Sequence, residues 1–414
     1  MSKTIAIIGA GIVGVSTAVW LLRDGHKVIL VDKSEPGEGA SHGNGGVLAS
    51  CSMVPVTVPG IVRKAPKMLF SSDQPLFLKW RYLPRLLPWL RNYLSHAKEA
   101  EVKKIARAVA QIVGDSLEEH QTLSKGTGAE KYIVPSDYLF LYRDRAHYQE
   151  DAFGWSIRAA CGFEWDELEG EAVQEYDPGF SSEIGFAARL GNHGRITDPG
   201  EYVKALARHA EAEGTTLVRA EVQTIHRNGE GTYVLQTGDG TISAEDIVIA
   251  TGAWSKPLAD QLGLNVPLES ERGYHLELWE PSFTPKSPVM VASGKFVITP
   301  MDGRVRLAGI VEFGGLEAAP SKAPINLLRD NIRAAMPELT WEREVEWMGH
   351  RPAPADSIPA IGEVPGKPGA WLAFGHHHIG LTGGPKTGRL LAQMISGRKS
   401  NLDMTPYSAA RFQS

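Results

Sequence analysis

Residues 5–14 read Ile-Ala-Ile-Ile-Gly-Ala-Gly-Ile-Val-Gly, an apolar run that ends in three glycines at the spacing G-x-G-x-x-G. This spacing is typical of the first turn of a βαβ unit that binds a dinucleotide. Gly9 permits the tight turn out of the strand, Gly11 lets the backbone approach a pyrophosphate, and Gly14 lets the following helix pack closely on the strand. The N-terminus of that helix presents free N–H groups and a partial positive charge to the phosphates.

The residues that follow this turn support the interpretation. Gly25 ends the expected helix, and residues 27–31 read as a second apolar strand closed by Asp32. The distance from Gly14 to Asp32 is close to the ~20 residues expected for an acid that binds a ribose. Residues 4–22 carry no charge and could instead form a membrane-spanning helix. The strand–turn–helix–strand order accounts for every residue, however, and a spanning helix does not.

Size and composition exclude several classes of protein. The chain has 414 residues, enough for two domains with a large interface, and its 43% hydrophobic and 22% charged residues are ordinary for a soluble protein. Its net charge of −5 argues against a nucleic-acid partner. Cys51 and Cys161 form neither a CxxC pair nor a disulfide framework, which fits a reducing compartment, and we therefore expect a cytoplasmic protein.

Later parts of the chain alternate between segments with helix and buried-strand patterns and segments dominated by strands and turns. Residues 102–123 have apolar side chains at helical spacing and predict one long helix, and Asp198-Pro-Gly-Glu201 is a capping box with proline at the first helical position. The buried strand 247–250 runs into the small-residue turn 251–255, which suits a second cofactor contact. Between residues 256 and 349, strands and turn signals indicate a mixed or antiparallel sheet.

The end of the chain again has the strand–turn–helix order of its beginning, with a buried strand at 370–374, a glycine-rich turn at 375–384 and a helix from Pro385. We therefore predict an α/β plus α+β fold with a discontinuous nucleotide-binding domain and an inserted substrate domain built on a mixed or antiparallel sheet. The nucleotide-binding domain would comprise residues 1–80, 190–255 and 350–414, and the substrate domain residues 81–189 and 256–349.

Five stretches together resemble the superfamily of FAD-dependent D-amino acid oxidases and dehydrogenases, above all bacterial D-amino acid dehydrogenases and glycine-oxidase-like proteins. They are residues 9–14, 41–46, 250–254, 349–362 and 375–384. The resemblance covers most of the chain, although residues 55–190 show little that matches. It implies a Rossmann-like FAD-binding domain and an oxidoreductase that works in amino-acid catabolism.

The resemblance also implies which residues contact FAD. In this sequence they are Gly9, Gly11, Ile12, Val13, Gly14, Asp32, Lys33, Ser41, Asn44, Gly45, Gly46, Val47, Val222, Thr251, Gly252, Trp254, Gly380, Leu381, Thr382 and Gly383.

The residues at 44–46 and at 382–385 also indicate how the flavin would be bound. Asn44 stands where covalent relatives have a His that links to the flavin, and because an amide cannot form that bond, we expect noncovalent FAD. Gly45 and Gly46 would let backbone N–H groups approach the isoalloxazine. The helix that opens at residues 382–385 would stabilise negative charge on reduced flavin. By local pattern alone, a Gly-Pro helix start without a ligand fits these residues equally well.

Arg351 is the main candidate on the substrate side. It lies in an apolar stretch that ends in prolines, and its planar fork can bind a carboxylate at two points. The residues alone would favour an internal salt bridge, whereas the resemblance implies that Arg351 anchors the substrate carboxylate. Tyr274 could hold the same carboxylate or cover the flavin, or it could be a packed core residue. His275 would face the other side of the strand unless the strand bulges.

His376, His377 and His378 are adjacent in sequence, and adjacent residues cannot readily converge on one metal ion, so we predict no metal site. His376 matches a Gly-His of the family, and one of the three could touch substrate. The predicted catalytic residues are therefore Arg351, Tyr274, His376 and His378.

The predicted reaction is hydride transfer from the Cα of a small D-amino acid, or of a secondary, proline-like amino acid, to flavin N5. The product would be an imino acid that water converts to a keto acid. A 2-hydroxy-acid dehydrogenase on the same scaffold stays open, because Arg351 would anchor that carboxylate equally well. A flavin-carrying subunit of a larger dehydrogenase complex and, third, a nicotinamide enzyme also stay open. The electron acceptor could be a quinone, another carrier or oxygen.

Residues 63–104 interleave basic and aromatic side chains. This segment could lie on an anionic membrane and reach a quinone, which would place the protein at the inner face of the membrane. Pro84 and Pro88 favour the alternative, a solvated basic surface.

Overall fold

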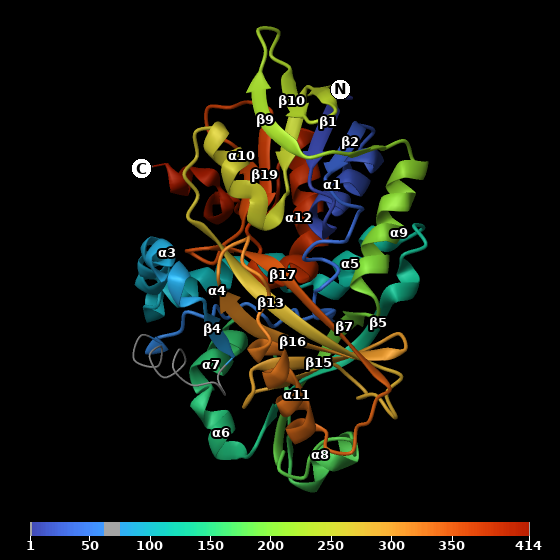
Figure 1. Ribbon diagram of the computed structural model, residues 1–414, viewed down its shortest axis with the longest axis vertical. Helices are drawn as coiled ribbons and strands as arrows, with labels where there is room; N and C mark the ends of the chain where they lie inside the picture. Colours follow the sequence, from blue (N-terminus) through green and yellow to red (C-terminus); the bar gives the residue numbers. More distant parts are fainter. Residues whose placement is uncertain (1, 62–74, 414) are drawn as a thin grey trace.

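A six-stranded sheet drawn from three separate parts of the chain forms the upper half of the molecule (Figure 1). The computed structural model describes residues 2–61 and 75–413, and in these residues the strand order is β18-β19-β12-β1-β2-β8. All neighbours are parallel except β18 and β19. The strands are β1 (Thr4–Ile8), β2 (Lys27–Asp32), β8 (Thr216–Arg219), β12 (Asp246–Ile249), β18 (Ala360–Glu363) and β19 (Ala370–Phe374).

Glycines allow the helices beside this sheet to approach closely. Gly9 has a φ of +111°, and a Cβ on Gly14 would lie 1.9 Å from the carbonyl oxygen of Gly9, so α1 can start directly above β1. A Cβ on Gly388 would lie 2.7 Å from the backbone of Ser16, so α12 packs directly on α1. The helices around the sheet are α1 (Ile12–Arg23), α9 (Pro199–Ala212), α10 (Ser255–Gln261) and α12 (Gly380–Ile395).

The lower half of Figure 1 contains a larger mixed sheet, as the strand pattern of residues 256–349 predicts. Within the described residues its order is β17-β13-β16-β15-β14-β5-β7-β3, with β4 beside β16 and β6 beside β7. Only the β14–β5 and β16–β4 pairs there are parallel. The strands are β3 (Val47–Leu48), β4 (Leu76–Leu78), β5 (Ile133–Tyr142), β6 (Asp166–Glu169), β7 (Phe186–Ile196), β13 (Leu268–Trp279), β14 (Val289–Val291), β15 (Phe296–Met301), β16 (Arg304–Phe313) and β17 (Arg343–Pro354).

The remaining elements cover the edges of these two sheets. A small antiparallel sheet of β9 (Val222–Arg227), β10 (Tyr233–Thr237) and β11 (Gly240–Ala244) lies at the top of Figure 1. The other helices are α3 (Leu83–Ser95), α4 (Glu99–Val113), α5 (Ser116–Ser124), α6 (Arg145–Glu150), α7 (Ala152–Ala160), α8 (Glu171–Tyr176) and α11 (Ala323–Ala335). Short 3₁₀ turns are η1 (Trp80–Tyr82), η2 (Glu130–Tyr132), η3 (Gly252–Trp254), η4 (His377–Ile379), η5 (Thr405–Tyr407) and η6 (Ala409–Phe412).

The two largest hydrophobic clusters of the described residues lie one against each large sheet. One packs β1 and β2 against α1, α4, α9 and α12, and the other packs the mixed sheet against α11. The single helix predicted for residues 102–123 is wrong, because α4 ends before Gly114 and α5 begins after Asp115. Residues 4–22 form a strand and a helix rather than one span. None of the helices in the described ranges combines the length and apolar composition that crossing a membrane requires.

The predicted domain division stays a prediction. All six strands of the upper sheet lie in the segments that we assign to the nucleotide-binding domain, but so do β3, β4 and the ends of β7 and β17, which pair in the mixed sheet.

Candidate functional site

A cavity of about 1080 Å³ is lined by residues from both sheets. Its volume reaches the upper end of the range usual for small-molecule sites, roughly 300–1,000 Å³. Most of the predicted cofactor residues line it: Gly9, Gly11, Ile12, Val13, Asp32, Lys33, Ser41, Asn44, Gly45, Val47, Val222, Thr251, Gly252, Trp254, Gly380, Leu381 and Thr382. Gly14, Gly46 and Gly383 do not line it and instead contact the surrounding fold.

The N-terminus of α1 opens onto this cavity with unused donors. The amide of Ala10 donates to Oδ2 of Asp32 at 2.7 Å, and the amide of Ile12 donates to Oγ of Ser41 at 2.9 Å. Among the described residues nothing accepts from the amides of Gly11 and Val13. Two free N–H groups at a helix N-terminus fit an anionic pyrophosphate. Asp32 and Ser41 thus shape this anion site from either side.

Lys33, which lines the cavity next to Asp32, lies over an aromatic ring. Its Nζ lies 4.6 Å from the centre of the Trp254 ring and 3.9 Å from Oε1 of Glu221. The Trp254 ring meets His350 edge-on, with ring centres 5.2 Å apart. These contacts fix the wall next to Val222, the residue predicted to meet the adenine.

The loop before β3 contains the predicted flavin contacts. Oδ1 of Asn44 accepts the amide N–H of Gly46 at 2.9 Å, so the Asn44 side chain folds back on its own loop. Gly46 has a φ of +75°, and a Cβ there would lie 2.6 Å from Cε of Met301. Gly46 is therefore required by the turn itself, whereas Gly45 faces the cavity.

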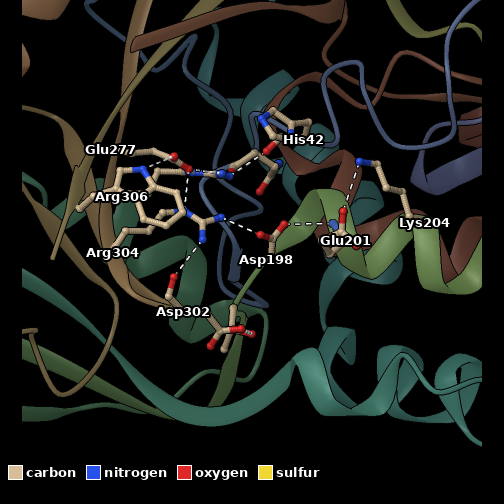
Figure 2. A network of polar contacts seen from close by, with 11 residues as sticks. His42, Asp198, Glu201, Lys204, Glu277, Asp302, Arg304 and Arg306 are labelled. Atoms are coloured by element: carbon tan, nitrogen blue, oxygen red, sulfur yellow. Dashed lines mark hydrogen bonds and ion pairs between the residues drawn. The ribbon is translucent and has the colours of Figure 1, made fainter. Parts of the chain in front are cut away.

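A buried charged network fixes the shape of this loop (Figure 2). Arg306 donates from Nη1 to the carbonyl oxygens of His42 at 2.8 Å and Asn44 at 2.6 Å. Glu277 on β13 accepts from Nη2 of Arg306 at 2.6 Å. Although burial alone would raise it, Arg306 and Arg304 lower the pKa of Glu277 to about 2.

The same network reaches α9 (Figure 2). Arg304 donates from Nε to Glu277 at 2.8 Å and from Nη2 to Asp198 at 2.9 Å. Asp198 in turn accepts the amide N–H of Glu201 at 3.0 Å and so caps α9, as the capping-box pattern predicts. Sequence analysis did not single out Arg304, Arg306 or Glu277. Charged residues that alternate within otherwise apolar strands were the available signal.

The N-terminus of α12 meets the cavity beside that of α1. Gly380, Leu381 and Thr382 line the cavity, and the close contact between Gly388 and Ser16 keeps the two helices side by side (Figure 1). The glycine turns at both ends of the chain thus converge on one cavity.

Arg351 lies on β17, directly opposite Glu271 of β13. Its guanidinium lies over Gly273, where a Cβ would be 2.8 Å from Cζ of Arg351. Among the described residues, this guanidinium forms no hydrogen bond and no ion pair. Burial lowers the pKa of Arg351, and the charge of Glu271 opposes that effect. A deeply placed cation that lines a cavity without a partner is suited to bind an anion.

The hydroxyl of Tyr274 is already engaged within the fold, and its role in holding a carboxylate or covering the flavin stays a prediction. It donates to Oε2 of Glu312 at 2.7 Å and accepts the amide N–H of Ser321 at 2.9 Å. Burial raises the pKa of Tyr274 to about 12. Its ring still contributes to the cavity wall, but its contacts are those of a core residue.

The strand bulges next to Tyr274, yet the bulge does not bring His275 into the cavity. The pairing of β13 with β16 shifts register between Gly273 and His275. His275 stacks on Trp347 with ring centres 4.9 Å apart, and its Nδ1 lies 3.1 Å from the carbonyl oxygen of Gly43. It therefore supports the loop before β3 rather than a substrate.

The three adjacent histidines have different surroundings. Nε2 of His376 lies 3.0 Å from Oγ1 of Thr387, and burial lowers the pKa of His376 to about 4. The side chain of His378 lines the cavity and is exposed there. Desolvation by the surrounding protein and the nearby His377 lower the pKa of His378 to about 3. No group of His, Cys, Asp and Glu side chains suited to a metal ion occurs in residues 2–61 and 75–413.

His377 contacts a residue that sequence analysis missed. Its Nε2 lies 3.0 Å from Oε1 of Glu271, close enough for an ion pair but outside hydrogen-bond geometry, and its Nδ1 lies 2.8 Å from Nδ1 of His378. Burial works against ionisation of Glu271, yet His377 and Arg351 lower its pKa. The hydroxyl of Tyr93 on α3 also lines this region, buried and without a partner in the described chain. No local sequence pattern marks Glu271 or Tyr93.

Comparisons with known proteins agree with this geometry. Residues 4–394 match the DAO family model, described as FAD dependent oxidoreductase. The chain is 39% identical to a D-amino-acid oxidase of Bradyrhizobium diazoefficiens over 99% of both chains. It is 28% identical to a D-amino acid dehydrogenase of Paramagnetospirillum magneticum, again over 99% of both.

Solved structures share the fold. Glycine oxidase from Geobacillus kaustophilus superposes with a TM-score of 0.77 at 23% identity, covering 100% of both chains. L-proline dehydrogenase from P. horikoshii gives a TM-score of 0.75 at 20% identity, covering 100% of this chain and 98% of that one. The family model matches residues 4–394 of this chain, and the glycine turns at both ends of the chain line one cavity, so this chain belongs to the DAO family of FAD-dependent oxidoreductases.

Proposed function

We propose that this protein oxidises the CH–NH bond of a small D-amino acid or of a proline-like secondary amino acid, giving an imino acid and then a keto acid. The observation that carries the proposal is the unpaired guanidinium of Arg351 in the cavity wall. Every α-amino acid carries an α-carboxylate, an anion that a guanidinium can bind through two hydrogen bonds. The names of the two curated relatives support a D-amino acid as substrate.

The chain's own residues would hold the cofactor at three places. The free amides of Gly11 and Val13 would bind the pyrophosphate, Asp32 the ribose, and the loop around Gly45 the flavin. Because Asn44 has no nucleophilic atom and folds back on Gly46, we propose that FAD is held noncovalently. Bound FAD supplies the acceptor for the hydride that leaves the substrate Cα.

The substrate would be oriented rather than activated by a strong base. Arg351 would fix the carboxylate and thereby place the Cα–H, which supplies rate through orientation. His378 faces the cavity with a pKa near 3 and is therefore neutral at pH 7, so it adds no positive charge beside the amine. His376 is held by Thr387, and we assign it a supporting role.

Anaerobic reduction of the FAD-loaded protein tests this proposal. We expect the flavin absorbance to bleach with small D-amino acids or proline and not with 2-hydroxy acids of the same size. The carboxylate of Glu271 in the same wall favours a substrate that carries an amine. Bleaching by hydroxy acids alone would favour the 2-hydroxy-acid dehydrogenase, and a protein that no substrate bleaches would be better described as a flavin-carrying subunit. Adding oxygen or a quinone to the reduced protein then identifies the electron acceptor.

Membrane contact through residues 63–104 stays a prediction. Arg63, Lys64 and Lys67 lie outside the described residues, and Lys79 approaches Glu312 at 3.9 Å. On α3, Leu86, Trp89 and Tyr93 are buried, whereas Arg85, Leu87 and Arg91 are exposed, as is Arg81 on η1 just before this helix. We propose that this exposed face contacts anionic lipid. Co-sedimentation with anionic vesicles that is lost at high salt would support the contact.

A further inference from the structure

Two opposite charges face one another across β13 and β17 without pairing. Glu271 and Arg351 occupy directly opposite register positions, and side chains at such positions lie on the same face with Cβ atoms about 5 Å apart. Both line the cavity, where water offers little screening. A carboxylate and a guanidinium placed in this way would normally form an ion pair, yet none forms within 4.0 Å in the described residues.

The two charged side chains point toward different neighbours. The Arg351 side chain runs along the strands and lies over Gly273, two residues beyond Glu271, where the missing Cβ leaves room for it. The carboxylate of Glu271 lies 3.0 Å from Nε2 of His377, and both side chains are only 6% exposed. Glu271 thus has a partner on η4 that replaces the one on the neighbouring strand.

The backbone of His377 suggests that its position is enforced. Its φ is +53°, in the left-handed region that residues other than glycine seldom adopt. Nδ1 of its ring lies 2.8 Å from Nδ1 of His378, so both ring nitrogens have a neighbour. Side-chain contacts on either side of the ring therefore keep it against Glu271.

We propose that His377 is a positioning residue that keeps Arg351 available to substrate by holding Glu271 away from it. The inference rests on the proposed function in one respect, that the anion bound by Arg351 is the substrate carboxylate. Without His377, the buried carboxylate of Glu271 would turn to the guanidinium, and an incoming carboxylate would have to displace it. Glu271 is therefore an internal competitor of the substrate, and His377 suppresses the competition.

His377→Asn is the appropriate variant. Asparagine tolerates the left-handed backbone, and its side chain ends at the δ position and so lacks the Nε2 atom that approaches Glu271. The affinity of the FAD-loaded protein for propionate, a carboxylate with no amine to oxidise, is measured by titration calorimetry. We expect it to fall about tenfold or more, while FAD content stays unchanged. With an oxidisable amino acid, KM should rise much more than kcat falls.

The decisive experiment is the double variant His377→Asn/Glu271→Gln. Removing the competing carboxylate should restore propionate affinity to within about threefold of the wild type, which a purely structural role of His377 would not produce. His226→Asn, on the exposed edge of β9 and away from the cavity lining, is the matched control and should bind propionate normally.

Three results would overturn the inference: a wild type that does not bind propionate, a His377→Asn protein that binds it normally, or a double variant that stays weak. Failure of the proposed function looks different, because propionate would then follow the expected pattern while no amino acid bleached the flavin.

Discussion

At the scale of single residues, the site depends on which polar groups are already engaged. Tyr274, His376 and Arg351 all line the same cavity, but only Arg351 has no partner in the described chain. A half-buried guanidinium that has no partner is stabilised when an anionic ligand binds it. Arg351 therefore carries the argument for substrate binding, and the other two support the wall.

Arg351→Lys keeps the positive charge but loses the planar fork that binds a carboxylate at two points. We expect KM for the substrate to rise about tenfold or more, because one charge-assisted hydrogen bond is lost. FAD content, measured by flavin absorbance, should stay normal. Unchanged steady-state kinetics would remove Arg351 from the site.

Gly273→Ala tests whether the guanidinium of Arg351 needs the space over Gly273. The new Cβ would lie 2.8 Å from Cζ of Arg351, so the side chain must move off the strand. We expect a higher KM with normal FAD content. Gly229→Ala, where a Cβ would meet nothing within 4 Å, is the control and should behave as the wild type. An unaffected KM in Gly273→Ala would show that the guanidinium adapts without loss.

The sequence predicts residues whose role is local and misses those whose role depends on distant contacts. Arg351 stands out because an Arg in an apolar, proline-ended stretch is unusual by itself. Glu271 and His377 do not, because their contact joins β13 to the turn before α12, more than a hundred residues apart in the chain. For Tyr274 the residue type fits more than one role, and its contacts with Glu312 and Ser321, which bear on that choice, are distant in the sequence.

At the scale of elements, the glycine turns are the most predictable part of the fold. The first turn fixes β1, α1 and β2 through steric requirements that are visible in ten residues. The helix predicted for residues 102–123 fails for the opposite reason, because a continuous apolar stripe does not reveal that Gly114 and Asp115 end one helix and begin another. Strand ends in the mixed sheet depend on pairing partners, which no local pattern contains.

Gly11→Val should give protein without flavin. A Cβ at this position would already lie 3.3 Å from Oγ of Ser41, and the two further methyl groups would occupy the approach to the free amides at the start of α1. We expect a folded, colourless protein, checked by flavin absorbance and circular dichroism. A normally yellow protein would contradict the assignment of this turn to the pyrophosphate.

At the scale of the whole molecule, the two ends of the chain and the two sheets meet around one cavity. Contact between α1 and α12 joins the ends, as the glycine-rich turns at both ends suggested. The network of Arg304, Arg306 and Glu277 joins the mixed sheet to α9 and to the loop before β3 (Figure 2). The relative placement of the two sheets therefore depends on buried charges as well as on apolar packing.

This dependence predicts how the molecule responds to acid. The pKa of Glu277 is about 2 in the folded protein, below the value near 4.5 of a free Glu side chain. A group whose pKa is lowered on folding contributes stability above its unfolded pKa and loses it as the pH falls through the folded pKa. Glu277 should thus contribute on the order of 3 kcal/mol at pH 7, and lose that contribution between about pH 4.5 and pH 2.

Glu277→Gln should remove this pH dependence. We expect the variant to be less stable at pH 7, with Arg304 and Arg306 left without their shared carboxylate, and to lose less stability than the wild type on acidification. Because Arg306 also holds the loop around Asn44, FAD should dissociate more readily from the variant. Urea unfolding of the FAD-free proteins across this pH range measures the first effect, and flavin release on dilution measures the second. Parallel stability–pH curves for variant and wild type would show that the network does not couple the two sheets.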